Sequence, residues 1–261
     1  MSFSLATSNS GAQYFQEALE VVTNNIASIE RAGFKEEFLV GSSNTYQQRK
    51  GVGSIAANNG AVVPAGVQIG QGVKTAAVVS KQSQGRLQRT DNPSHMAIQG
   101  KGYFQVEMPN GQIAYTRDGT FALNGDGVIV TQTGNVVAPA ITIPQNAEYF
   151  VVTRNGSVQA KMPGQPNLVD IGAIETVTFV NEEGLRKIDD NLLLETDASG
   201  APIAGVPGED HRGHILQGHY EGSNIDMVAQ VTKLIQIQRA YEMNIKGITT
   251  YKEMMGRIDQ I

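Results

Sequence analysis

Apolar residues near the N-terminus recur at alternating steps of three and four positions, the heptad spacing of a helix with one apolar seam. Ser10 followed by Gln13 is typical of a capping box, and beyond it no Gly or Pro intervenes before Gly33. The pattern predicts a helix over about residues 10–30, weakest at the poor helix formers Thr23-Asn24-Asn25. Its seam is Ala12, Phe15, Leu19, Val22, Ile26 and Ile29.

The C-terminal segment predicts a second, longer helix over residues 224–255. Ser223 and Asp226 form another capping-box pattern, and the acidic residue suits the positive end of a helix. Between them and residue 255 there is no Pro and one Gly, Gly247. The expected seam has polar residues at Gln238 and Lys252 and otherwise consists of Met227, Val231, Leu234, Tyr241, Ile245, Ile248 and Met255.

The middle of the chain alternates short β-prone runs with turn signals. Asn110-Gly111, Asp118-Gly119 and Asn124-Gly125-Asp126-Gly127 tolerate the positive φ angles of tight hairpins. The pattern predicts a β meander or partly closed barrel over residues 92–210. The expected strands are Tyr103–Val106, Ile113–Thr116, Thr120–Leu123, Val128–Thr131, Tyr149–Thr153, Ser157–Lys161, Thr176–Val180 and Leu192–Leu194.

Residues 41–72 differ from both regions, being rich in Gly, Ser, Asn, Gln and Ala. Such a composition is typical of an extended arm or linker unless a partner orders it. The sequence therefore predicts an α+β chain, in which paired, coiled-coil-like terminal helices flank an extended connecting segment and a central all-β domain.

An apolar helix seam needs a partner. The two terminal helices can pair with each other, but such a pair has a thin core and would gain by packing against copies of itself. An αα hairpin docked on the β-domain explains the same spacing. The pattern alone leaves both arrangements open.

The composition of the chain excludes several classes of protein function. The chain of 261 residues has no Cys, which excludes disulfides, thiolate zinc sites and thiol catalysis. The net charge of −5 argues against nucleic-acid binding. No apolar run reaches the length of a membrane span, and residues 1–29 lack the Lys or Arg of a secretory signal.

Two clusters are candidates for site chemistry. His211, His214 and His219 could ligate a metal, but Gly213 and Gly218 place them on loops without a spacing that aligns their rings. The acidic group Asp189, Asp190, Glu195 and Asp197 could supply a carboxylate pair for a secreted domain that binds or cleaves polysaccharide. Solvated loop residues explain both clusters, and we expect no enzyme activity, no cofactor and no metal.

Several motifs resemble those of bacterial flagellar rod and hook proteins. Asn24-Asn25-Ile26-Ala27 followed by Gly33-Phe34-Lys35 is similar to the family's N-terminal signature, and Gln238-Arg239-Ala240-Tyr241-Glu242 to its C-terminal motif. Gly100–Phe104 and Tyr115–Phe121 resemble the start of its β-domain. Within the family, the length and the segment Gly66–Val73 resemble the distal rod subunits most closely, with proximal rod or hook-type subunits as the alternative. The arm over residues 46–66 separates the two, and in a distal rod we expect it to stiffen the shaft.

The resemblance implies a structural subunit that polymerises helically into the rigid rod of the flagellar basal body. It implies terminal helices lining an inner tube (1–30 and 224–261), a connecting domain (31–90 and 212–223) and an outer β-domain (91–211). Gly33, Phe34 and Lys35 would belong to the connecting segment. The assembly interface would comprise Phe15, Leu19, Val22, Asn24, Asn25, Ile26, Ile29, Val231, Leu234, Gln238, Arg239, Tyr241, Ile245 and Ile248.

Location and partners follow from the same resemblance. The rod would cross the periplasm to the outer membrane, and its subunits would be exported without a cleaved signal by the flagellar type III apparatus. Expected partners are further copies of the chain, proximal rod subunits, the hook protein or hook–rod junction, and the surrounding P- and L-ring bushing.

Overall fold

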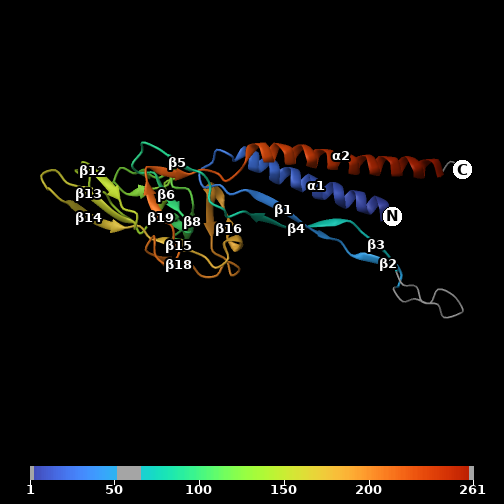
Figure 1. Cartoon of the computed structure of the whole chain (residues 1–261), viewed down its shortest axis with the longest axis horizontal. Helices are drawn as coiled ribbons and strands as arrows, with labels where there is room; N and C mark the ends of the chain where they lie inside the picture. Colours follow the sequence, from blue (N-terminus) through green and yellow to red (C-terminus); the bar gives the residue numbers. More distant parts are fainter. Residues whose placement is uncertain (1–2, 52–65, 259–261) are drawn as a thin grey trace. The chain divides into compact units, whose positions relative to one another are not determined.

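A computed structural model describes residues 3–51 and 66–258 (Figure 1). The chain is α+β, with a helix at each end and a mostly β region between them. It divides into two compact units, one formed by residues 1–26, 37–79 and 226–261 and the other by residues 27–36 and 80–225. We call them the helical unit and the β unit. The three-domain division expected from the sequence stays a prediction.

The helical unit is built on two long helices, α1 (Phe3–Ala27) and α2 (Met227–Ile258). Three contacts fix their register: Asn25 with Gln230, Gly11 with Asn244, and Ser8 with Gly247. Asn25, Gly11 and Ser8 are successively fourteen and three residues apart towards the start of α1. Their partners in α2 are the same numbers of residues apart towards its end. The helices therefore run antiparallel and lie side by side in Figure 1.

The helix starts differ from the expected capping boxes. Ser10 lies inside α1, where its hydroxyl donates to the carbonyl of Thr7 at 2.9 Å. The helix begins earlier because the preceding residues contain no Gly or Pro to stop it. At α2 the cap is Asp226 alone, whose Oδ1 accepts the Val228 amide at 3.0 Å. The Ser223 hydroxyl instead accepts the amide of Ile225.

Strands accompany the helices within the helical unit. β1 (Glu37–Ser43) pairs with β4 (Val73–Ser80), and β2 (Tyr46–Lys50) pairs antiparallel with β3 (Val67–Gly70). The β1–β4 ladder lies against α1, because the amide of Val73 donates to the Ser10 hydroxyl and a Cβ on Gly41 would meet the Tyr14 ring. The described parts of the expected arm are thus strands, whereas residues 52–65 of that arm lie outside the described residues.

The β unit confirms two of the three predicted hairpin turns, and Asp118-Gly119 is the exception, because Gly119 lacks a positive φ and β8 does not pair with β9. The turn at Asn110-Gly111 joins β7 to β8, and the turn ending at Gly127 precedes β10. Both glycines have positive φ, +78° and +79°. Its elements are β5 (Leu87–Arg89), β6 (Met96–Gln99), β7 (Tyr103–Glu107), β8 (Ile113–Thr116), β9 (Ala122–Leu123), β10 (Ile129–Val130), β11 (Val136–Ala138), β12 (Tyr149–Val152), β13 (Ser157–Lys161), β14 (Leu168–Ala173), β15 (Thr176–Thr178), β16 (Arg186–Lys187), β17 (Leu192–Leu194), β18 (Ile203–Gly205), β19 (His214–Gln217) and β20 (His219–Glu221), with single 3₁₀ turns at Glu182–Gly184 and Asp189–Asn191.

One larger sheet organises these strands, in the order β16-β17-β8-β7-β11-β10-β9, with β15 joining at β7 and β18 beyond it. Around it are the sheet β12-β13-β14 and the ladders β19-β6 and β20-β5. Strand alternation divides the core. Phe104 packs edge-on against Phe121 in the main cluster, while its neighbour Tyr103 points to the opposite face and packs against Phe179.

The seam that α2 buries is not the expected one. Leu234, Tyr241 and Ile248 are half-buried as predicted, but Met227, Val231, Ile245 and Met255 are exposed. The buried or half-buried face instead consists of Gln230, Leu234, Ile237, Ala240, Tyr241, Asn244, Ile248 and Tyr251. The reason is the close approach to α1: a Cβ on Gly11 would lie 2.6 Å from Asn244 Oδ1, so the missing side chain of Gly11 makes room for that polar residue.

Candidate functional site

The Gly33-Phe34-Lys35 motif forms a buried turn in the β unit. Gly33 has φ +70°, and a Cβ there would lie 2.5 Å from the backbone nitrogen of Asp118. Its amide donates to the Glu221 carbonyl at 2.7 Å. Phe34 is buried, and Lys187 Nζ lies 5.6 Å from its ring centroid. The motif therefore requires a glycine for both conformation and space.

Lys35 belongs to a buried charge network centred on Glu221. Its Nζ donates to Glu221 Oε1 at 2.5 Å and to the Ser83 carbonyl at 2.9 Å, while Arg117 lies 3.3 Å from Glu221 Oε2. Glu221 is fully buried, and both cations are nearly so. Burial lowers the pKa of Lys35, against the opposing attraction of the Glu221 carboxylate.

The same network holds together three segments of the β unit, 33–36, 81–85 and 221–224. Glu221 Oε1 also accepts the Gly85 amide at 2.7 Å. Asn224 accepts the Glu36 amide at 2.7 Å and donates to the Lys81 carbonyl at 2.8 Å. We call Lys35, Arg117, Glu221 and Asn224 the clamp. Each of the three segments leads along the chain directly into the helical unit.

Asn25 of α1 connects elements of the helical unit, as the clamp connects segments of the β unit. Its side-chain amide accepts the backbone amide of Glu37 at 3.0 Å and donates to the carbonyl of the same residue at 2.7 Å. It also donates to Gln230 Oε1 at 3.4 Å and is fully buried. Asn25 is a poor helix former, but its side-chain amide bonds both the N–H and the C=O of Glu37 in β1, as a neighbouring strand would.

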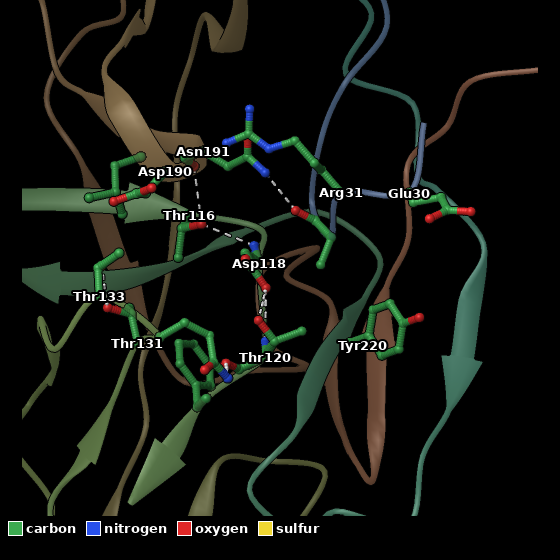
Figure 2. A pocket seen from close by; sticks show the side chains of 14 residues that line it. Glu30, Arg31, Thr116, Asp118, Thr120, Thr131, Thr133, Asp190, Asn191 and Tyr220 are labelled. Atoms are coloured by element: carbon green, nitrogen blue, oxygen red, sulfur yellow. Dashed lines mark hydrogen bonds between the residues drawn. The ribbon is translucent and has the colours of Figure 1, made fainter. Parts of the chain in front are cut away.

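A polar pocket of about 360 Å³ lies in the β unit (Figure 2). Thr116, Asp118 and Thr120 from one turn point towards one another in it: the Asp118 amide donates to the Thr116 hydroxyl, and the Thr120 hydroxyl donates to Asp118 Oδ1 at 2.7 Å. Across from them Asn191 donates to the carbonyl of Ala32 at 2.7 Å. These groups satisfy each other, which is the pattern of a structural turn and not of an activated nucleophile.

The predicted interface residues occupy varied surroundings. In α1, Val22 and Asn25 are buried, Phe15, Leu19 and Ile26 are half-buried, and Asn24 is exposed. Ile29 lies beyond the end of α1 and is half-buried in the β unit. In α2, Leu234, Tyr241 and Ile248 are half-buried, whereas Val231, Gln238, Arg239 and Ile245 are exposed. Their role in assembly stays a prediction.

Of the two clusters considered for chemistry, only the acidic one lies mainly on turns, whereas His214 begins β19 and His219 begins β20, contrary to the loops expected from the sequence. Asp189 and Asp190 form a 3₁₀ turn, and Asp190, Asp210 and His211 have positive φ. His211 and His214 are exposed, and His219 pairs its ring with the Gln217 carbonyl. Within residues 3–51 and 66–258, no three His, Cys, Asp or Glu side chains gather as metal ligands. Neither described helix has the length and apolarity to cross a bilayer.

Comparison with known proteins shows which family these motifs belong to. Residues 97–160 match the flagellar hook protein FlgE/F/G D1 domain, and residues 216–261 match the C-terminal domain of the flagellar basal body rod FlgEFG proteins. The flagellar basal-body rod protein FlgG of Caulobacter vibrioides is 45% identical over 257 residues, which cover 98% of each chain. The chain belongs to the flagellar basal-body rod protein family.

Other members of the rod protein family are similar over nearly the same length. The FlgG of Agrobacterium fabrum is 42% identical over 98% of each chain, and that of Bacillus subtilis is 34% identical over 98% of this chain and 97% of its own. Rod proteins are structural components of the flagellar basal body and not enzymes, so the chain is a structural subunit. This result rules out a polysaccharide-cleaving role for the 189–197 carboxylates.

The sequence motifs of this rod protein missed the centre of the clamp. Glu221 and Asn224 belong to none of the motifs that the sequence offered for the site. Gln230 was also missed, because a polar residue off the expected apolar seam suggests an exposed position. Both omissions concern polar residues whose partners lie far away in the sequence.

The alkaline stability of the β unit should depend on Tyr103. Burial raises the pKa of its phenol, and the Glu182 carboxylate 3.3 Å away adds to the rise. The folded state therefore keeps a proton that the unfolded state releases near pH 10. We expect the free energy of unfolding to fall above about pH 10 by up to ~1.4 kcal/mol per pH unit from this group, and less in Tyr103→Phe.

Urea unfolding of both proteins from about pH 8 to about pH 11 measures this difference. Burial also raises the pKa of Tyr115, so the variant should lose part of the alkaline slope and not all of it. Identical slopes in the two proteins would contradict the assignment to Tyr103.

Proposed function

We propose that this rod protein is the subunit of the distal rod, where it polymerises helically, transmits torque to the hook and surrounds an export channel. Support comes from relatives that are FlgG proteins similar over 98% of each chain, and from the apolar residues that α2 leaves exposed. An apolar face without an intramolecular partner favours packing against further copies. A proximal rod or hook-type subunit is the alternative, since a FlgF of Caulobacter vibrioides is 32% identical over 90% of this chain.

In this proposal the terminal helices form the inner layer of the polymer, with coiled-coil packing, and the interface residues lie along them. The clamp suits torque transmission, since it ties three segments of the β unit with buried, charge-assisted hydrogen bonds. The proposed neighbours are proximal rod subunits, the hook or its junction, and the P- and L-rings. The proposed route is type III export without a cleaved signal to a rod that crosses the periplasm.

Charges placed on the helix seam should stop assembly without unfolding the β unit. Leu19→Asp and Ile245→Asp each put a carboxylate where apolar packing between subunits is expected. Burying it unpaired costs several kcal/mol, so polymers should disappear at concentrations where the unchanged chain forms them. Sedimentation velocity and electron microscopy of the full chain measure assembly, and near-ultraviolet circular dichroism measures the β unit.

The matched control is Gln236→Asp, which adds the same charge at an exposed polar position of α2. It should leave assembly intact. If the unchanged chain forms no polymer at any concentration, or if both seam variants assemble normally, the proposed function is wrong. Loss of the β-unit signal in Leu19→Asp would instead assign its seam an intramolecular role.

A further inference from the structure

Five exposed apolar residues of α2 lie on one side of the helix, where Gln238 and Glu242 separate the last of them from the others. Met227, Val228, Val231, Ile235 and Ile245, which we call the α2 stripe, fall within about 100° of one another at 100° per residue. Their exposed fractions run from 37% for Ile245 to 75% for Val228. The face that packs against α1 is centred about 110° away around the helix. The stripe is thus a separate apolar surface.

A second apolar feature of the helical unit is a groove of about 200 Å³. Tyr14, Ala18 and Val22 of α1, Phe38 and Leu39 of β1 and Ile237 of α2 line it, and we call it the α1–β1 groove. Phe38 is 40% exposed at its edge. At 100° per residue, Ile237 lies about 120° around α2 from the centre of the stripe. The groove and the stripe are therefore on different sides of α2.

The charges bordering these surfaces are complementary. Within or at the edge of the arc that the stripe covers lie Glu242, Lys246 and Arg239, with a net charge of +1. Beside or within the groove lie Glu17, Glu37 and Lys233, with a net charge of −1. The helices as wholes show the same contrast, because α1 contains two Glu and no Lys or Arg, whereas α2 contains five Lys or Arg and two Glu.

We propose that the α2 stripe of one copy packs into the α1–β1 groove of a second copy. The inference rests on the proposed function and specifies the contact that would build the polymer. A ridge and a groove on different faces of one unit make a head-to-tail contact, which leaves a free ridge at one end and a free groove at the other. Repetition of such a contact gives an open helical polymer when the rotation between copies does not close a ring. A stripe-to-stripe contact would instead close a dimer and bring the basic borders of two copies together.

The absence of cysteine from the chain allows a clean test by cross-linking. Full-length Ile235→Cys and Phe38→Cys proteins are mixed and mildly oxidised, and disulfide-linked dimers are counted on a non-reducing gel. The matched control replaces Ile235→Cys by Met243→Cys, an exposed apolar position on another face of α2. A disulfide needs Cα atoms within about 7 Å, so the mixture should give at least about ten times more dimer than the control or either variant alone.

The other outcomes separate the inference from the proposed function. Equal cross-linking by Ile235→Cys alone would show a stripe-to-stripe contact and overturn the inference. A mixture that cross-links no better than the Met243→Cys control, while the unchanged chain still polymerises, would overturn the inference and leave the proposed function standing. An unchanged chain that sediments as a monomer at every concentration would remove both.

Discussion

Glu221→Gln is expected to lower the free energy of unfolding of the β unit by about 3–5 kcal/mol. The change removes the carboxylate that faces both Lys35 and Arg117, and all three side chains are buried. Two cations would then remain in a low-dielectric environment without a counter-charge. The carboxylate also accepts the Gly85 amide, so a backbone hydrogen bond is weakened as well.

The loss should depend on pH in a defined direction. Without Glu221 the native pKa of Lys35, already lowered by burial, falls further below its unfolded value of 10.5. The unfolded state then binds more protons between these two values, so stability rises with pH in that range. The deficit of the variant should be largest near neutral pH and smaller in alkaline solution.

Urea unfolding followed by tyrosine fluorescence measures both effects, since the chain has eight Tyr and no Trp. Lys81→Gln is the matched control, because it breaks the exposed Lys81–Glu36 pair and should cost less than about 1 kcal/mol. Adding Lys35→Met to Glu221→Gln should recover part of the loss. A cost for Glu221→Gln as small as that of the control would show that the clamp contributes little.

Gly33→Ala is expected to destabilise the β unit by at least about 3 kcal/mol. Two penalties combine at this position. The φ of +70° is strained for any residue with a Cβ, and the added methyl group would lie 2.5 Å from the nitrogen of Asp118 and 2.8 Å from the carbonyl carbon of Arg117. Both are backbone atoms, so the turn must move, and the adjoining clamp with it.

Gly111→Ala separates the two penalties. Gly111 has φ +78°, but no heavy atom lies within 4 Å of a Cβ placed there. This control should therefore cost only the strain of the left-handed conformation, about 1–2 kcal/mol. Urea unfolding of both variants gives the difference. Equal losses would mean that the Gly33 turn relaxes without cost and that its close packing is unimportant.

Local patterns predicted the elements of this protein better than their boundaries. The Asn-Gly and Asp-Gly signals placed the β7–β8 hairpin and the turn before β10, because positive φ is a property of the residues themselves. The heptad spacing predicted both terminal helices but missed the start of α1, since Ser10 can cap a helix or lie inside one with equal ease.

The functional site was predicted in part. The family motif indicated Gly33, Phe34 and Lys35, and the structure places them in one buried turn. Their partner Glu221 is 186 residues from Lys35, and nothing in its neighbourhood distinguishes a buried carboxylate from a solvated one. The sequence indicated that Asn25 weakens its helix, because its hydrogen bond with Glu37 depends on the fold and cannot be predicted from neighbouring residues.

Two long amphipathic helices flanking a hairpin-rich β region could be predicted from the sequence alone, because helical period, strand alternation and turn chemistry are local properties. Which face of α2 packs inside the molecule could be learned only from the three-dimensional fold. Adjacent apolar faces satisfy the heptad equally well, and the choice between them depends on shape. The small residues Ser8 and Gly11 of α1 leave room for Asn244 and Gly247, so this face of α2 packs against α1. Val228, Val231 and Ile235 then remain exposed on another face.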